Sequence, residues 1–398
     1  MAKICWYFQI HQPWRIRDVD VFDVGKRSEY FAVEPKAKQN NEKIMKKVAE
    51  KSYRPMLLLL QKLITKHKRF KFALSITGVA IEQMKTYTPD LLEILKELIK
   101  SGQVEVLAET YYHSLSSLYS PAEFISQVSK HTRLVQDLFG VTPQVFRNTE
   151  LIYSNKIAEM VQHMGYKGML AEGADRILKG RTPTLVYYSP SGLPLLLKHY
   201  MLSDDIAFRF SQSSKSEKPL TAETFSHWIS NAFGEDEVVN LFMDFETFGE
   251  HQWKDTGIFD FFENLVAIAL KDKNIFVTPS EALQVSPQDL FESESPVSWA
   301  DVDRDITAWK GNPLQEDALT VIYSLEGEIL KSGDEILVED WRRLQTSDHF
   351  YYMCTKWAND GDVHAYFSPY GSPYKAYINY NNVLSDLKWR LNQRKING

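Results

Sequence analysis

Two short segments of the chain place carboxylates where they could act as a catalytic pair. Glu150 follows an apolar run at residues 144–148, and Asp244 and Glu246 lie at the end of another at residues 238–245. Cleavage of a glycosidic bond with retention needs one ionised carboxylate, which attacks the anomeric carbon, and one protonated carboxyl, which protonates the leaving oxygen. Glu150 and Asp244 are candidates for these two roles.

The neighbours of each candidate in the sequence fit its role. Asp244 stands between two apolar residues and two positions before Glu246, and both an apolar setting and a nearby carboxylate raise the pKa of a carboxyl group. Glu150 comes three positions after Arg147, a cation that favours its ionised form. These neighbours are compatible with Glu150 as a nucleophile and Asp244 as an acid and base.

The elements that must bring these residues together alternate along the chain. Apolar runs typical of strands lie at residues 4–10, 70–76, 104–109, 144–148, 168–172, 193–199 and 238–245. Amphipathic patterns predict helices between several of them, at residues 89–101, 121–139 and 154–164. Strands that alternate with helices favour a parallel sheet, and seven strand candidates suit an incomplete barrel better than a regular eightfold one.

In a parallel barrel the loops that follow the strands converge on one rim, where the active sites of such barrels lie. Each polar residue at this rim also has a simpler structural role available. Glu150 could cap a following helix, and Asp244 and Glu246 could pair with Arg or Lys. The collection of so many polar residues at one rim nevertheless favours a functional site. Those that follow predicted strands, besides the two candidates, are His11, Gln12, Glu109, His113, Glu246 and His251.

The chain departs from this alternation in two places. Residues 14–52 are polar and lack strand periodicity, which predicts an insertion after the first strand. Residues 280–312 break the pattern with several Ser and Pro, and helical patterns follow at residues 313–330, 335–357 and 376–394. We expect a catalytic barrel at residues 1–285 and a helical C-terminal domain at residues 286–398. Asp348 and His349, polar residues within one of these helices, indicate that this domain completes the cleft.

Composition narrows the classes of function. The formal net charge of the 398 residues is −6, with acidic and basic residues mixed along the chain. Nucleic-acid-binding proteins usually concentrate Lys and Arg on one face, so we expect no nucleic-acid partner. No apolar segment approaches the length needed to cross a membrane. Aromatic residues make up 13% of the chain, and their rings stack on sugars as well as filling cores.

The N-terminus and the cysteines favour a cytoplasmic protein. Residues 1–4 run directly into a predicted strand and lack the apolar stretch of a signal peptide. Cys5 and Cys354 are the only cysteines, which is too few for a disulfide framework. Both stand beside apolar or aromatic residues, so we expect them to be buried, whether or not they pair. The sequence gives no indication of the oligomeric state.

An ordered set of five motifs resembles glycoside hydrolase family 57. The first motif alone is weakly specific, whereas the five together follow the family's order across nearly the whole chain. They are His-Gln-Pro at residues 11–13, Gly-Gln-Val-Glu at 102–105, Phe-Arg-Asn-Thr-Glu at 146–150, Met-Asp-Phe-Glu-Thr-Phe-Gly-Glu-His at 243–251, and a segment from Trp341 through Leu-Gln-Thr-Ser-Asp-His-Phe-Tyr-Tyr-Met at 344–353.

The resemblance implies an incomplete (β/α)7 barrel followed by a helical bundle, a retaining mechanism, and α-glucan or maltodextrin substrates. Glu150 falls at the family's nucleophile position and Asp244 at its acid/base position. The chain looks most like the family's α-amylases, although Phe146 and Arg147 stand where many members carry a tryptophan. The substrate-binding residues that we expect are His11, Gln12, Glu109, His113, Glu246 and His251, with Trp253, Trp299, Asp348 and His349 as further candidates.

Alternative functions follow from the same residues. An α-amylase cuts internal α-1,4 bonds in starch, glycogen or maltodextrins, whereas a 4-α-glucanotransferase or branching enzyme passes the glycosyl group to a sugar hydroxyl. A catalytically silent glycan-binding protein is disfavoured because both Glu150 and Asp244 are present. A metal-dependent deacetylase would need clustered His and Asp ligands, and His11, His113 and His251 lack such a spacing. We therefore expect an α-amylase-type hydrolase without a cofactor or metal ion.

Overall fold

The strands of the barrel belong to two sheets. The computed structural model describes residues 2–26, 29–31, 36–211, 220–234, 237–356 and 368–397. In the first sheet, parallel pairing joins β3 (Val104–Val106), β2 (Phe72–Ile76), β1 (Lys3–Ile10) and β8 (Val238–Asp244) in that order. In the second sheet it joins β4 (Val145–Arg147), β5 (Gly168–Glu172) and β7 (Pro194–Lys198). Three short strands flank these sheets: β6 (Tyr187–Tyr188), β9 (Ile275–Val277) and β10 (Asp289–Leu290).

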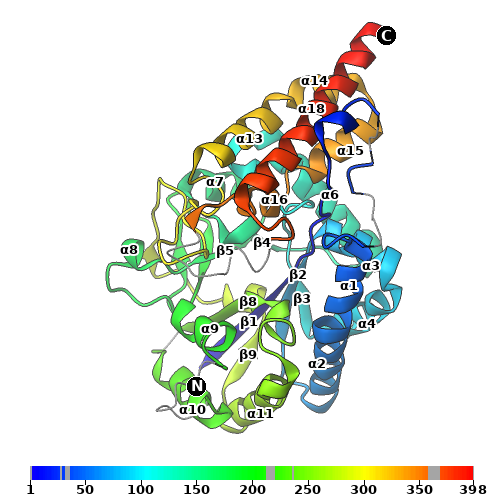
Figure 1. Ribbon diagram of the computed structural model, residues 1–398. Helices are drawn as coiled ribbons and strands as arrows, with labels where there is room; N and C mark the ends of the chain where they lie inside the picture. Colours follow the sequence, from blue (N-terminus) through cyan, green and yellow to red (C-terminus); the bar gives the residue numbers. More distant parts are fainter. Residues whose placement is uncertain are drawn as a thin grey trace.

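Hydrogen bonds outside the regular strand pairing join the two sheets at both seams. Beyond the end of β3, the N–H of Ala108 donates to the carbonyl of Val145 at 3.0 Å, and the N–H of Arg147 donates to the carbonyl of Ala108 at 2.8 Å. At the other seam, the N–H of His199 donates to the carbonyl of Asn240 at 2.9 Å, which links β7 to β8. The result is an incomplete (β/α)7 barrel (Figure 1).

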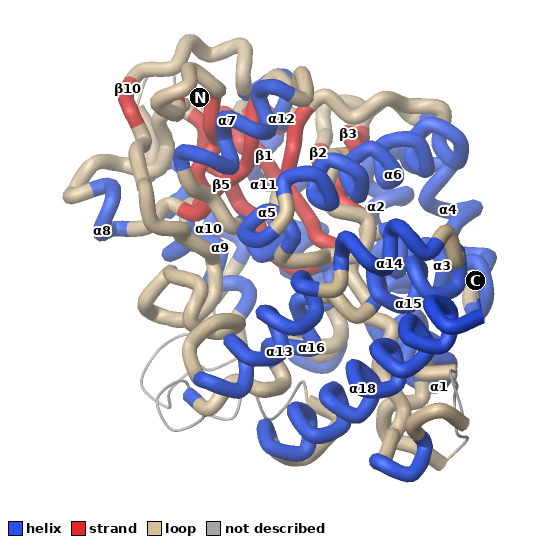
Figure 2. Tube along the Cα trace, turned by 90° about the horizontal axis from the view of Figure 1, so that it is seen from above, coloured by secondary structure: helices blue, strands red, loops and turns tan. Residues whose placement is uncertain are grey.

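Helices surround the strands, as Figure 2 shows from above. Local sequence signals set several of their ends: Ser120 accepts a hydrogen bond from the backbone of Glu123 at the start of α6, and Ser154 accepts one from Ile157 at the start of α7. The helices of this region are α1 (Asn41–Val48), α2 (Arg54–Lys66), α3 (Gly78–Tyr87), α4 (Pro89–Lys100), α5 (Ser116–Tyr119), α6 (Pro121–Phe139), α7 (Asn155–His163), α8 (Asp175–Leu178), α9 (Tyr200–Ala207), α10 (Ala222–Asn231), α11 (Ile258–Lys271) and α12 (Pro279–Ala282).

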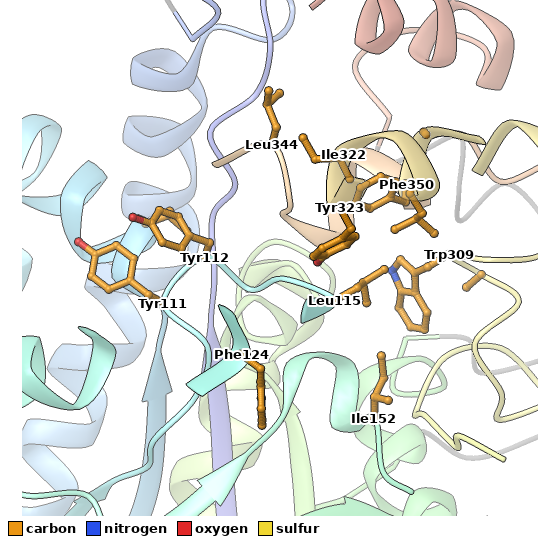
Figure 3. Close-up of a cluster of buried hydrophobic side chains, with 14 of the residues drawn as sticks. Tyr111, Tyr112, Leu115, Phe124, Ile152, Trp309, Ile322, Tyr323, Leu344 and Phe350 are labelled. Atoms are coloured by element: carbon orange, nitrogen blue, oxygen red, sulfur yellow. The ribbon is translucent and has the colours of Figure 1, made fainter. Parts of the chain in front are cut away.

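A helical bundle packs on one side of the barrel (Figure 1). One buried hydrophobic cluster joins the two parts: Leu115 and Ile152, from loops after barrel strands, belong to it together with Trp309, Ile322 and Phe350 (Figure 3). Burial of each large apolar side chain is worth about 1.5–3 kcal/mol, so this cluster fixes the bundle to the barrel. The helices of the bundle are α13 (Pro313–Ser324), α14 (Glu326–Ser332), α15 (Glu335–Arg343), α16 (Ser347–Tyr351) and α18 (Pro373–Asn397).

The structure confirms the seven predicted strands, and the helix predicted at residues 121–139 has those same bounds as α6. The helical patterns at 313–330 and 335–357 each form two helices instead of one. In the second case the chain leaves the helix to bind the barrel, because the hydroxyl of Thr346 donates to the carbonyl of Tyr112 at 2.8 Å. Residue 357 lies outside the described residues.

The predicted insertion at residues 14–52 contains more regular structure than its polarity indicates. It holds α1 and most of a π-helical turn, η2 (Ala49–Tyr53). Only Asn41, Met45 and Val48 of α1 are buried, so its apolar face is narrow and the segment is polar on average. Residues 27–28 and 32–35 lie outside the described residues.

Two predictions about the whole chain can be compared with the structure. Cys5 and Cys354 are both buried, as predicted, and no disulfide joins the one to the other, which answers the question of their pairing. No helix in the described ranges combines the length and apolarity needed to cross a membrane.

Candidate active site

A cavity of about 510 Å³ lies at the carboxyl-terminal ends of the barrel strands. Residues at or just beyond the ends of β1, β4, β7 and β8 line it, and the helical bundle contributes part of its wall through α16. Its polar and aromatic lining includes Gln9, His11, Gln12, Arg15, His113, Glu150, Lys198, Asp204, Asp244, Glu246, His251, Trp299, Arg304, Asp348, Tyr351 and Tyr352. The structure therefore brings most of the predicted site residues together.

Glu150 lies in an unusual turn directly after β4. In the short 3-10 segment η3 (Thr149–Leu151), Glu150 has φ 56° and ψ 26°, and Leu151 also has a positive φ of 52°. Left-handed conformations are uncommon for residues other than glycine and collect at functional sites. Ser154 caps the following helix α7, so Glu150 does not take the structural role of a helix cap.

Donors from three separate segments hold the Glu150 carboxylate. His113 Nε2 lies 3.1 Å from Oε1, and Ser347 Oγ donates to the same oxygen at 3.3 Å. The indole N–H of Trp299 donates to Oε2 at 2.7 Å. Burial alone would raise the pKa of Glu150, but the hydrogen bond from His113, the charges of His113 and Arg147, and the Trp299 bond hold it below the ordinary value. Glu150 is therefore ionised at neutral pH.

Asp244, the last residue of β8, faces the same cavity but has different surroundings from Glu150. Its carboxyl group takes part in none of the hydrogen bonds among the described residues. Burial and then the charge of Glu150 raise its pKa to about 6, and the charges of Arg147 and His113 oppose this rise only in part. The pKa values of the two candidate residues are thus shifted in opposite directions, and at a pH between the two values Glu150 is ionised while Asp244 is protonated.

Glu246 follows two residues later and lines the cavity as predicted. Gln12 Nε2 donates to Oε1 at 3.2 Å, and the hydroxyl of Tyr53 donates to the same oxygen. Burial and then the charge of Asp244 raise the pKa of Glu246 to about 8. At neutral pH Glu246 is mainly a neutral acid, which can donate a hydrogen bond to a sugar hydroxyl.

His113 connects Glu150 to a second, fully buried carboxylate. Its Nδ1 lies 3.4 Å from Oε2 of Glu109, and Ser75 also donates to Glu109. Burial disfavours a charged imidazole, but the hydrogen bonds to Glu109 and Glu150 raise the pKa of His113 to about 9. Glu109 is fully buried and lies behind His113, so it supports the cavity without lining it.

His11, directly after β1, joins the barrel to the bundle. Its Nε2 lies 2.9 Å from Oδ2 of Asp348 in α16, and its Nδ1 lies 3.0 Å from the hydroxyl oxygen of Thr77. Its ring stacks on that of His113 with the ring centroids 4.0 Å apart. Burial and then the charge of His113 lower the pKa of His11, so the neutral ring donates to the Asp348 carboxylate and accepts from Thr77.

His251 reaches the cavity from a tight turn after β8. Gly249 in this turn has φ 109°, and a Cβ there would lie 1.9 Å from the carbonyl oxygen of Lys51. Only glycine fits this close approach of two backbones. Burial lowers the pKa of His251 to about 4, so its ring is neutral at neutral pH and can serve as donor or acceptor.

Besides Glu109, two other predicted binding residues do not line the cavity, Trp253 and His349. The Trp253 side chain is 55% exposed, and its ring centroid lies 5.0 Å from Nζ of Lys51. His349 is buried, with its ring centroid 5.8 Å from that of Tyr380. Asp348 occupies the face of α16 toward the cavity, and the next residue of a helix necessarily points elsewhere.

A cluster of charged side chains on one wall of the cavity was not identified from the sequence. Lys198 Nζ lies 3.0 Å from Asp204 Oδ1, and Arg304 Nη2 lies 2.9 Å from Asp204 Oδ2. Glu172 is fully buried near both cations, and burial raises its pKa to about 7. Glu172 ends a predicted strand and Lys198 lies one residue before the end of another, so the strand-end criterion that selected Glu109 could have found them. No comparable signal marks Asp204 or Arg304.

The barrel, the rim cavity and the two carboxyl groups are the features of a glycoside hydrolase. The family model described as glycosyl hydrolase family 57 matches residues 5–295. The chain belongs to glycosyl hydrolase family 57.

Individual relatives agree with this assignment. The chain is 38% identical over 405 aligned residues to a Methanocaldococcus jannaschii protein named as a candidate α-amylase, and the match covers 98% of this chain and 85% of that protein. Its fold resembles that of a family 57 branching enzyme from Pyrococcus horikoshii, with a TM-score of 0.68, 17% identity, and 90% and 86% of the two chains covered. The fold also resembles that of a Thermotoga maritima α-amylase, with a TM-score of 0.63 at 11% identity. This match covers 99% of this chain and 94% of that one.

Proposed function

We propose that this chain is a retaining α-glucan hydrolase of the α-amylase type, with Glu150 as the nucleophile and Asp244 as the acid and base. One observation carries the proposal: the two carboxyl groups face one cavity and their pKa values are shifted in opposite directions, so that at a pH between these values Glu150 is ionised and Asp244 is protonated. Retaining glycoside cleavage requires this combination of an ionised and a protonated carboxyl group.

In the first step, an oxygen of Glu150 bonds to the anomeric carbon while the bond from that carbon to the leaving oxygen breaks. Asp244 gives its proton to the leaving oxygen, so the released glucan departs as a neutral alcohol. The negative charge of Glu150 disappears as the glycosyl ester forms. Because this charge is one cause of the raised pKa of Asp244, that pKa then falls.

In the second step, the ionised Asp244 takes a proton from water, and the water oxygen attacks the anomeric carbon. The ester bond breaks and its electron pair returns to Glu150. His113 and Trp299 stabilise the returning carboxylate through the same hydrogen bonds that hold it before the reaction. Two successive inversions leave the product with the α configuration of the substrate.

Three observations support an α-glucan such as starch, glycogen or a maltodextrin as the substrate. The chain belongs to family 57, and a relative that matches nearly its whole length is named as a candidate α-amylase. The cavity also offers sugar hydroxyls the polar groups of Gln12, Glu246 and His251, and its lining includes the aromatic side chains of Trp299 and Tyr351.

Transfer of the glycosyl group to a sugar hydroxyl is the second candidate function. The fold is similar to that of the Pyrococcus horikoshii branching enzyme as well as to that of an α-amylase. Hydrolysis and transfer would use the same two carboxyl groups and differ only in whether water or a sugar attacks the glycosyl-enzyme. A glycan-binding protein without activity would not need two carboxyl groups whose pKa values are shifted in opposite directions.

We further propose that the helical domain beyond about residue 286 completes the cleft of the barrel domain at residues 1–285. The support is that Asp348 and Tyr351 of α16 and the adjacent Tyr352 line the cavity. The hydrogen bond between His11 and Asp348 crosses the proposed boundary.

Product analysis on maltoheptaose tests the proposal. Short linear maltodextrins are the expected products of hydrolysis, whereas products longer than the substrate would indicate transfer, and branched products a branching enzyme. NMR of freshly formed hydrolysis products should show the α-anomer before mutarotation. A first-formed β-anomer would contradict retention, and binding without any product would favour the glycan-binding protein.

A further inference from the structure

The loop between β10 and α13 carries Trp299 to the Glu150 carboxylate. The backbone N–H of Trp299 donates to the carbonyl of Glu150 at 3.2 Å, and the indole N–H donates to its carboxylate at 2.7 Å. The Trp299 ring also packs against two cations, the guanidinium of Arg147 at 4.9 Å and Nζ of Lys198 at 5.5 Å. Because Trp299 belongs to a loop, something must fix the loop for these contacts to persist.

Arg304 closes this loop into a compact turn. Its Nη1 donates to the carbonyl oxygen of Trp299 at 2.6 Å, and its own carbonyl accepts a hydrogen bond from the N–H of Ser298 at 3.2 Å. Asp301 and Arg304 have positive φ angles of 54° and 51°. Residues other than glycine keep such angles only where the surrounding contacts hold them, so this turn depends on the contacts of its side chains.

The same guanidinium anchors the turn to the barrel. Arg304 Nη2 donates to Asp204 Oδ2 at 2.9 Å, and Lys198 Nζ donates to the other oxygen of Asp204 at 3.0 Å. The buried Glu172 carboxylate lies 3.7 Å from Arg304 Nη1. An arginine fork can bond a carbonyl and a carboxylate at once, whereas the compact charge of a lysine cannot reproduce this planar geometry.

We propose that Arg304 is a positioning residue for the nucleophile, because its bridge from Asp204 to the Trp299 carbonyl holds the indole N–H against Oε2 of Glu150. The role rests on the proposed function, since it matters only if Glu150 forms the glycosyl-enzyme. An N–H donor stabilises a carboxylate more than the corresponding ester. The bond therefore keeps Glu150 ionised before it attacks and favours its departure when water cleaves the ester.

A double-mutant cycle tests this role with Arg304→Gln, Trp299→Phe and the combined variant. On maltoheptaose, each single variant should lower kcat about 10- to 100-fold, with a much smaller change in KM. Each should also move the acidic limb of kcat/KM to higher pH, because Glu150 loses a donor. The combined variant should fall no further than Trp299→Phe. Losses that multiply, or an acidic limb that does not move, would overturn the proposal.

Three further variants sharpen the cycle. Arg304→Lys should behave like Arg304→Gln, and wild-type behaviour would overturn the bridging role. Arg181→Gln is a matched control, because Arg181 bonds Asp289 at 2.9 Å and does not line the cavity. Glu150→Gln separates the two proposals: normal turnover in that variant would refute the proposed function. If Glu150→Gln is inactive and the cycle is nevertheless additive, only the role of Arg304 fails.

An NMR measurement tests the same contact without turnover. With ¹⁵N-labelled tryptophan, the indole signal that is missing from Trp299→Phe identifies Trp299. In Arg304→Gln this signal should shift upfield as the bond to Glu150 weakens, and in Arg181→Gln it should stay in place. A Trp299 signal that is unchanged in Arg304→Gln, while the melting temperature shows the variant to be folded, would overturn the proposal.

Discussion

Glu150 and Asp244 come from different sheets of the barrel and are held in opposite ways. Glu150 follows β4 and accepts hydrogen bonds from His113, Trp299 and Ser347. Asp244 ends β8, and only burial and nearby charges act on its carboxyl group. A carboxyl group without hydrogen bonds can gain or lose a proton without breaking any contact, whereas one with three donors keeps its charge. The structure thus separates a group with a stable charge from a group with a mobile proton.

The largest expected effect comes from removing the stable charge. Glu150→Gln should lower turnover of maltoheptaose by about 10⁴-fold or more, because no covalent intermediate can form. Binding of maltodextrin, measured by calorimetry, should change little, since the amide keeps the size of the side chain. Near-normal turnover would show that Glu150 is not the nucleophile, and the contrast between the two residues would then not concern catalysis.

Replacing Asp244, the group with the mobile proton, should lower turnover less than replacing Glu150, and the loss should depend on the leaving group. Asp244→Asn should lower turnover of maltoheptaose about 10²- to 10⁴-fold, the usual contribution of a general acid and base. With an aryl α-glucoside whose phenol leaves without protonation, formation of the glycosyl-enzyme should be far less affected. Stopped-flow detection of the released phenol measures this step, and an equal loss on both substrates would show that Asp244 is not the acid.

A weaker effect is expected when one donor to Glu150 is lost. His113→Gln removes a charge that holds the pKa of Glu150 low, so that pKa should rise. In the wild type, kcat/KM should fall as pH rises through about 6, because Asp244 then loses its proton. It should also fall on the acidic side, at a pH below the ordinary pKa of Glu150, because Glu150 then becomes protonated. In His113→Gln the acidic limb should move upward and kcat should fall about 10-fold. An acidic limb at the wild-type pH would argue against this control of the Glu150 charge.

The smallest effect concerns stability at Glu246. The folded protein raises the pKa of Glu246 to about 8, from an ordinary value of 4.5, so it binds the proton more tightly than the unfolded chain does. The contribution of Glu246 to the unfolding free energy is therefore present below the ordinary pKa and is lost as pH rises through about 8. Glu246→Gln cannot ionise, and its melting temperature should fall less than that of the wild type between pH 5 and 9. The exposed control Glu159→Gln should follow the wild type, and a slope unchanged by Glu246→Gln would contradict the raised pKa.

Local patterns were sufficient to predict most of the fold. The bounds of α6 follow from Ser120 just before its first residue and Gly140 just after its last, and both are signals in the local sequence. The two-residue strands β6 and β10 could not be predicted, because two residues show no periodicity. The split between α15 and α16 depends on a contact of Thr346 with the barrel, which no local pattern contains.

The site was predictable where a strand end defines it. Glu150 and Asp244 follow from this rule, and Glu172 and Lys198 could have followed from it. Asp204 and Arg304 could not, since their ion pair joins residues 100 positions apart. The rule also does not say which way a side chain points. We also predict a separation of about 5–5.5 Å between the two carboxyl groups, the distance that retention requires. The cytoplasmic location stays a prediction.

Contacts at the cavity join parts of the chain that are made at very different times. The ribosome completes His11 long before Asp348, its partner 337 positions later, and Ser347 follows Glu150 by 197 positions. A nascent barrel therefore holds His11 and Glu150 without these partners until α16 has emerged. A chain released early, before residue 347, has an unfinished cavity whatever the state of its strands. Synthesis itself thus delays assembly of the site until residues 347 and 348 have been made.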